Sequence, residues 1–144
     1  MKRTKTVFET PVYKVQLVHE STVVVTERQI RSPEAAANIV KDYLRGVDRE
    51  HFIGLYLNSA NRFIGLHTIS IGILNSSLVH PREVFKLAYM MNAASIIVAH
   101  NHPSGNVEPS GEDIAITKQL VEAGKILGIP LHDHIIITER NGYV

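Results

Sequence analysis

The chain has 144 residues, and 15 Lys and Arg residues nearly balance 14 Asp and Glu residues, so the formal net charge is +1. A hydrophobic share of 44% and a charged share of 20% are typical of one soluble globular domain, which excludes intrinsic disorder and collagen. The absence of cysteine excludes disulfides, thiolate nucleophiles and Cys-based zinc or iron–sulfur sites. The nearly neutral charge offers no electrostatic argument for nucleic acid binding.

Secretion and membrane insertion require apolar stretches that this sequence does not supply. No apolar run follows the basic residues near the N-terminus, so we expect no signal peptide. Two stretches without formal charge, residues 63–81 and 87–107, are interrupted by His, Asn, Ser, Gly or Pro, so neither is expected to span a membrane. We therefore expect a soluble, cytoplasmic protein.

The N-terminal part of the chain is predicted to form strands before the first helix. Residues 12–18 alternate apolar and polar side chains, and residues 21–26 (STVVVT) are a second candidate strand. A helix then begins at Ser32 and Pro33, because Ser can cap a helix and Pro has no N–H to lose in the first turn. Gly46 lies near the expected end of this helix.

The rest of the sequence interleaves strands and helices within one predicted domain, residues 1–144, made of an N-terminal strand region (1–31) and a core (32–144). The predicted strands are residues 51–57, 62–74, 95–99 and 131–138, with a polar turn at 58–61 that makes a hairpin of the first two. The predicted helices begin at His80-Pro81 and at about Ser110, and Gly128 ends the second of them. This order predicts a mixed α/β sandwich with helices covering the sheet.

The most informative stretch follows the apolar strand 95–99 and reads HNHPSGNVEPSGED from residue 100. His100 and His102 are two residues apart, so extended backbone would point both imidazoles the same way. Asp113 falls in the first turn of the next helix, and a turn through residues 103–105 would bring its carboxylate back to the histidines. Two nitrogens, one oxygen and a vacant position are the ligand set of a catalytic zinc site, whereas magnesium prefers oxygen ligands. The sequence predicts one zinc ion per chain.

The His-x-His pair carries little information by itself. Eight histidines in 144 residues give roughly 0.4 such pairs by chance, and His132 and His134 form a second one. The Ser and Asp at fixed positions make the combination specific. Ser110 and Asp113 also fit an ordinary helix start, with a Ser cap and an acidic first turn, and the two interpretations are compatible. For His132 and His134, a structural role ranks ahead of a supporting role beside the ligands.

Hydrolysis at such a site needs a general base outside the ligand set, to move a proton from water to the leaving amine. Glu50 is a candidate among ten glutamates because it enters the strand 51–57, where its side chain can lean over the sheet edge. The alternative is an ordinary solvated pair of Arg49 and Glu50, and the residues alone leave both interpretations open.

The run from residue 100 resembles the metal-binding motif of the JAB/MPN (JAMM) metalloproteins, His-x-His, seven residues, then Ser-x-x-Asp. Within that superfamily the chain is most similar to RadC-like proteins over about residue 32 to the C-terminus. The RadC-like motifs in this sequence are REHF from Arg49, HPRE from His80, HNHPSG from His100, EPS from Glu108 and DHII from Asp133. The resemblance implies an α/β fold, the MPN/JAB (cytidine-deaminase-like) three-layer α/β/α sandwich around a mixed β-sheet.

The resemblance also implies a role for each candidate residue. His100, His102 and Asp113 would bind zinc. Glu50 would hold and deprotonate the zinc-bound water, and the Ser110 hydroxyl would steady the tetrahedral oxyanion. The implied activity is hydrolysis of a peptide or isopeptide bond by a zinc metallopeptidase, so the expected partner is a peptide or protein substrate.

Three alternatives come from other functional classes. A DNA-repair accessory module with a structural or vestigial metal has support from the family label only, and the helical DNA-binding region of many RadC-like proteins is not expected here. A deaminase would need His-x-Glu and Cys-x-x-Cys ligands, which are missing. An HNH nuclease is excluded, because its motif positions are dispersed and it needs a basic surface. Since relatives continue into a further strand, we also expect an exposed edge near residues 135–138 that allows pairing with a second copy.

Overall fold

The computed structural model describes residues 5–72 and 79–138. Its elements follow in the order α1 (Pro33–Tyr43), β1 (His51–Leu57), β2 (Phe63–Ile71), α2 (Pro81–Met90), β3 (Ser95–Asn101), α3 (Gly111–Leu127) and β4 (Leu131–Ile137). The sheet has the strand order β2-β1-β3-β4. β1 runs antiparallel to both β2 and β3, whereas β4 runs parallel to β3, so the sheet is mixed as predicted.

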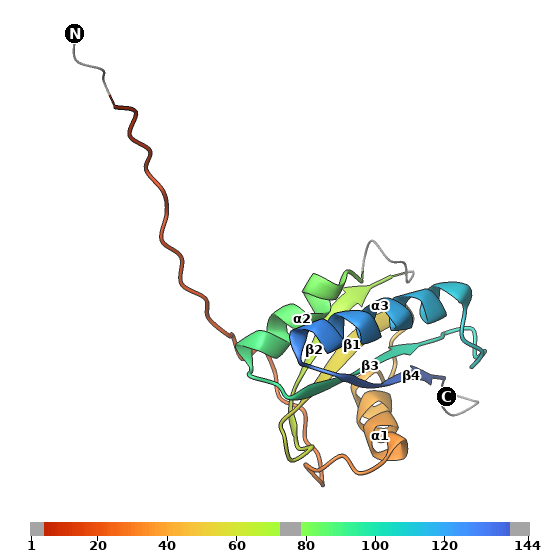
Figure 1. The fold of residues 1–144 in the computed structure, drawn as a ribbon. Helices are drawn as coiled ribbons and strands as arrows, with labels where there is room; N and C mark the ends of the chain where they lie inside the picture. The colour runs from red at the N-terminus through yellow and green to blue at the C-terminus, as the bar shows by residue number, and fades with distance from the viewer. Residues whose placement is uncertain (1–4, 73–78, 139–144) are drawn as a thin grey trace.

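Helices cover both faces of this sheet, with α1 on one face and α2 and α3 on the other (Figure 1). Alternate residues of β1 supply the two cores. Ile53, Leu55 and Leu57 pack into the cluster under α1, and Phe52 and Tyr56 pack into the cluster under α2 and α3. The predicted three-layer α/β/α sandwich is confirmed.

The helix boundaries agree with the local signals in the sequence. Ser32 caps α1 and its hydroxyl oxygen accepts from the Ala35 N–H at 3.2 Å. His80 caps α2 through its ring, and Ser110 caps α3. Gly128 ends α3 in the left-handed conformation, with φ of 73°, which favours glycine.

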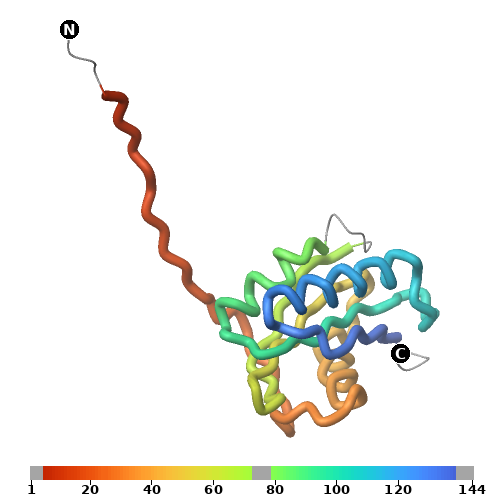
Figure 2. Tube along the Cα trace, in the orientation of Figure 1, coloured from red at the N-terminus to blue at the C-terminus, as the bar shows by residue number. Residues whose placement is uncertain are grey.

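The predicted strands at residues 12–18 and 21–26 are wrong. Residues 5–22 are exposed and belong to no helix or strand, and this segment extends away from the sandwich (Figure 2). Backbone pairing next to the sheet starts at Gln29, which forms an isolated bridge with Arg62 beside β2. Alternation makes a segment able to form a strand, but a strand also needs a neighbour for its backbone groups, and residues 12–18 have none within the described part of the chain. Within the described residues 5–31 the chain therefore forms no strand, and its one bridge is that of Gln29.

Three other strands differ in length from the prediction, and the strand expected over residues 131–138 is β4, which ends one residue earlier at Ile137. The strand expected over residues 62–74 is present as β2, which ends at Ile71, and positions 73–74 lie outside the described residues. β3 is two residues longer than predicted and includes His100 and Asn101. As a result His100 has the fixed backbone of a central strand. Among the described residues, no helix combines the length and apolar character needed to cross a membrane.

Candidate metal centre

The end of β3 and the start of α3 bring the three predicted ligands together. His100 and Asp113 are only 1% and 3% exposed, and His102 lies directly after β3. The His100 and His102 Nε2 atoms are 2.8 Å apart. The Asp113 Oδ1 atom is 3.1 Å from His100 Nε2, and its Oδ2 atom is 3.3 Å from His102 Nε2. Among the described residues, these three form a group whose candidate ligand atoms all lie within 4.8 Å of one another.

A capping box sets the position of Asp113. Its backbone N–H donates to the Ser110 Oγ at 3.1 Å, and its Oδ2 accepts from the Ser110 N–H at 2.7 Å. The predicted helix-start interpretation of these two residues is thus confirmed. It also holds the carboxylate toward the histidines, so the capping role and a ligand role coexist in one geometry.

Burial and hydrogen bonding shift the pKa values of three groups at this site, His100, His134 and Asp113. Burial, and then the neighbouring His134, lower the pKa of His100 to about 3. Burial also lowers the pKa of His134 to about 4. For Asp113, burial opposes ionisation, but the hydrogen bonds from Ser110 and the attraction of His100 and His102 outweigh it and hold the pKa below its usual value.

The hydrogen bond of His102 fixes which of its nitrogens faces the group. His102 Nδ1 lies 2.6 Å from the Asn106 backbone oxygen. A carbonyl oxygen only accepts, so His102 Nδ1 carries a proton and donates it there, while Nε2 faces His100 and Asp113. A metal ligand needs this orientation, with Nε2 toward the ion and Nδ1 held by an acceptor.

Glu50 lies outside this ligand group, at the position directly before β1. In that strand Phe52 pairs with His100 in the antiparallel ladder. Continuing that register by two residues aligns Glu50 with His102. Its backbone carbonyl accepts from the Gly72 N–H at 2.8 Å.

Asn101, which was not among the predicted site residues, ties the segment around Glu50 to β3. Its Oδ1 accepts from the His51 N–H at 2.6 Å, and its Nδ2 donates to the Arg49 carbonyl at 2.8 Å. The residues on both sides of Glu50 are therefore held by the side chain that separates His100 from His102. Its place inside the motif was a signal for such a role.

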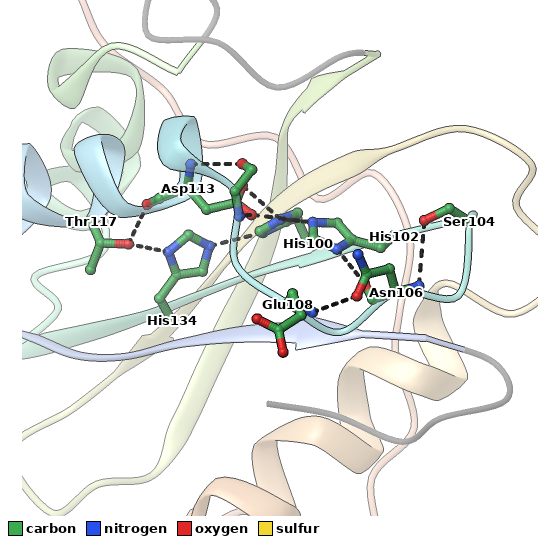
Figure 3. A network of polar contacts seen from close by, with 9 residues as sticks. His100, His102, Ser104, Asn106, Glu108, Asp113, Thr117 and His134 are labelled. Carbon is green, nitrogen blue, oxygen red and sulfur yellow. Dashed lines mark hydrogen bonds and ion pairs between the residues drawn. The ribbon is translucent and has the colours of Figure 1, made fainter.

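Two further residues outside the predicted ligand set, His134 and Thr117, join this hydrogen-bond network. His134 Nε2 lies 2.8 Å from His100 Nδ1, and the Thr117 Oγ1 lies 2.6 Å from His134 Nδ1 (Figure 3). Thr117 follows Asp113 by one helical turn, which is the signal that would have found it. His132 is exposed.

Two hollows adjoin the ligand group. One of about 510 Å³ lies between α3 and β4 and is lined by Asp113 and Thr117 among others. The other, of about 720 Å³, lies between the end of α1 and the loop after β3, and His102 lines it. Both have the volume of a small-molecule or peptide side-chain site.

Comparison with known proteins agrees with this geometry. Residues 30–144 match the family described as the RadC-like JAB domain. The chain belongs to the RadC-like JAB domain family. Similar curated proteins are the UPF0758 proteins of Desulforamulus reducens, 57% identical over 111 residues, and Shouchella clausii, 56% identical over 108 residues. A UPF0758 protein of Bacillus cereus is 58% identical over 111 residues.

These alignments cover 77%, 75% and 77% of this chain but 49%, 47% and 49% of the three relatives, so the chain spans about half the length of the curated relatives it matches. The names of these relatives state no substrate or reaction. Family membership confirms the RadC-like resemblance, and the α/β fold agrees with it. Within the RadC-like JAB fold, the His100, His102 and Asp113 group is a candidate metal site.

Proposed function

We propose that this RadC-like JAB domain is a zinc-dependent hydrolase that cleaves an amide bond in a peptide or protein substrate. The observation that carries the proposal is the convergence of two imidazole nitrogens and a carboxylate within 4.8 Å, at the end of a central strand. Acceptor atoms this close repel one another unless a cation lies between them.

The donor set fits zinc among the common divalent ions. Zinc takes imidazole nitrogen and carboxylate oxygen in a four-coordinate site, whereas calcium and magnesium prefer oxygen ligands alone. His100, His102 and Asp113 would hold the ion and leave a fourth position open, as in catalytic sites. Zinc bound there would supply Lewis-acid polarisation of the substrate carbonyl and of a water molecule.

The chain's own residues supply the proton transfers in this proposal. The Glu50 carboxylate takes a proton from the attacking water and delivers it to the leaving amine nitrogen. The Ser110 Oγ already accepts from the Asp113 N–H, so its own hydroxyl proton is available to donate to the developing oxyanion.

Zinc content tests the ligand assignment. We expect about one zinc per chain by elemental analysis of the parent protein and of Glu50→Gln, and none in Asp113→Ala. Asp42→Ala is the matched control. The Asp42 carboxylate is exposed and forms an ion pair with Arg45. A parent protein that takes up no zinc after incubation with it would contradict the proposal.

Hydrolysis of a fluorogenic peptide mixture and of an isopeptide-linked substrate tests the reaction. Glu50→Gln should lower the rate by about 10²–10⁴-fold while zinc stays bound, which is the usual effect of removing a general base. Glu122→Gln, at an exposed glutamate on α3, should match the parent. Full zinc occupancy with no hydrolysis, together with salt-sensitive DNA binding, would instead favour the accessory-module alternative.

A further inference from the structure

We propose that Asn101 is a positioning residue that fixes the backbone of Glu50 relative to the metal ligands at the end of β3. The proposal rests on the proposed function, because it gives Asn101 a task in the reaction only if Glu50 is the general base. Asn101 lies between His100 and His102 in the sequence and shares their backbone. Its side chain acts on the reaction through Glu50, not through the substrate or the metal.

The Asn101 side chain extends the pairing between β1 and β3 beyond the last pair of their ladder. That last pair is Phe52 with His100. One residue further along β3, the Asn101 Oδ1 accepts from the His51 N–H at 2.6 Å, and its Nδ2 donates to the Arg49 carbonyl at 2.8 Å. The side-chain amide thus takes the place of a backbone peptide group, since it offers one acceptor and a donor to the neighbouring chain.

The two hydrogen bonds of Asn101 lie on either side of Glu50 in the sequence. The carbonyl before Glu50 and the N–H after it both point toward β3, which is the pattern that a strand residue shows toward a parallel neighbour. The carbonyl of Glu50 itself accepts from the Gly72 N–H, directly after β2, at 2.8 Å. The backbone that carries the Glu50 carboxylate is therefore held by β3 and by the end of β2.

Burial limits the competition of water for these bonds. Asn101 is buried and Glu50 is half-buried, so the loss of either bond would leave a backbone group without an equivalent partner. Because Asn101 stands between the two histidine ligands, the Glu50 backbone keeps a fixed place relative to them. A displacement of about 1 Å at a reacting group can cost about 100-fold in rate, so this coupling matters for a general base.

The alternative is a purely structural role, in which Asn101 only satisfies two backbone groups and stabilises the sheet. Both roles predict a loss of stability when the amide is removed, so stability does not distinguish them. Only the positioning role predicts that the effect of Asn101 on the rate passes through the Glu50 carboxylate. The measurement that distinguishes the two roles is therefore a double-mutant cycle between Asn101 and Glu50, with the rate of hydrolysis as the readout.

The cycle uses the zinc-loaded full chain and the most rapidly cleaved component of the fluorogenic peptide mixture. Asn101→Ala removes the amide, and Asn101→Leu removes it while keeping a similar side-chain volume. Both should lower kcat by about 10–100-fold, with KM within about 3-fold of the parent and about one zinc still bound per chain. In the Glu50→Gln background, Asn101→Ala should lower the rate by less than about 3-fold more, because the group that it positions is already gone.

Two control variants separate positioning from general destabilisation. Gly124→Ala lies near the opposite end of α3 from Asp113, and its added Cβ would lie 2.5 Å from the Ile129 backbone oxygen, so it destabilises the domain away from the site. Asn58→Ala removes another asparagine that accepts from two backbone N–H groups, at 3.0 Å each, in the turn after β1. Both variants should retain the parental kcat and zinc content. A fall in kcat of Gly124→Ala equal to that of Asn101→Ala would overturn the inference.

Hydrogen exchange of the His51 amide in the parent gives a readout that needs no variant to fold. We expect this amide to be protected, because it donates to the Asn101 side chain, and an unprotected amide would overturn the inference.

The outcomes separate this inference from the proposed function. A parent that hydrolyses the peptide, together with a folded Asn101→Leu protein of parental kcat, overturns the inference alone. Additive losses in the cycle, or zinc lost from the Asn101 variants, also overturn it, because Asn101 then acts on a group other than Glu50. A zinc-loaded parent without any hydrolysis overturns the proposed function, and with it the base that Asn101 would position.

Discussion

At the scale of single residues, the site depends on side chains that satisfy buried backbone groups as much as on the ligands. Asn101 is 8% exposed and uses its amide oxygen and nitrogen to bind the backbone on both sides of Glu50. A hydrophobic side chain of similar size would fill the space but leave the His51 N–H and Arg49 carbonyl without these partners. Unpaired buried polar groups are costly, so this position needs an amide.

We predict that Asn101→Ala lowers the free energy of unfolding by about 1–3 kcal/mol, because two part-buried backbone groups lose their hydrogen bonds. Urea unfolding followed by circular dichroism would measure the change. The control is Asn58→Ala, which removes two hydrogen bonds to the exposed Ala60 and Arg62 backbone, where water can replace the amide. Equal losses in the two variants would contradict the burial argument.

At the scale of elements, helix ends were predictable because their signals are local. A cap involves groups one to three residues apart, so Ser32 and Ser110 act on their helices wherever the helices pack. Close contacts between elements carry no such signal. A Cβ atom added at Gly124 on α3 would lie 2.5 Å from the Ile129 backbone oxygen, so this glycine lets α3 approach the turn before β4.

We predict that Gly124→Ala destabilises the domain by about 1–3 kcal/mol, since the overlap is with backbone and cannot be relieved by a side-chain rotation. This sign is opposite to the gain of about 1 kcal/mol that helix propensity alone would give. Urea unfolding distinguishes the two signs. Gly111→Ala on the same helix has no atom within 4 Å of the added Cβ and should be neutral or slightly stabilising.

At the scale of the whole molecule, the sandwich holds the site without help from the N-terminal segment. Residues 5–22 are exposed, although they include apolar side chains such as Val12, Tyr13 and Val15. Contact with the core begins with the half-buried Val25 and is complete at Ile30.

We predict that a chain starting at Ser21, after an initiating Met, keeps the parental free energy of unfolding within about 0.5 kcal/mol, because truncating exposed backbone removes no packing. Its zinc content should equal that of the parent. Urea unfolding and elemental analysis would measure both. A loss above about 1 kcal/mol would mean that the removed residues pack on the sandwich or on a second copy.

Local patterns along the chain were enough to predict the order and type of the elements from residue 32 onward, the caps, and the three members of the candidate metal site. These depend on periodicity and short-range chemistry that can be read along the chain. Tertiary structure decided what depends on neighbours distant in sequence. Residues 12–18 have a strand pattern but pair with no strand of the described part of the chain. The hydrogen bonds of Asn101, Thr117 and His134 form only when β1, β3, β4 and α3 meet. Hydrogen-bond partners 17 to 50 residues apart leave no local pattern, because only the packing of the sheet and α3 brings them within reach.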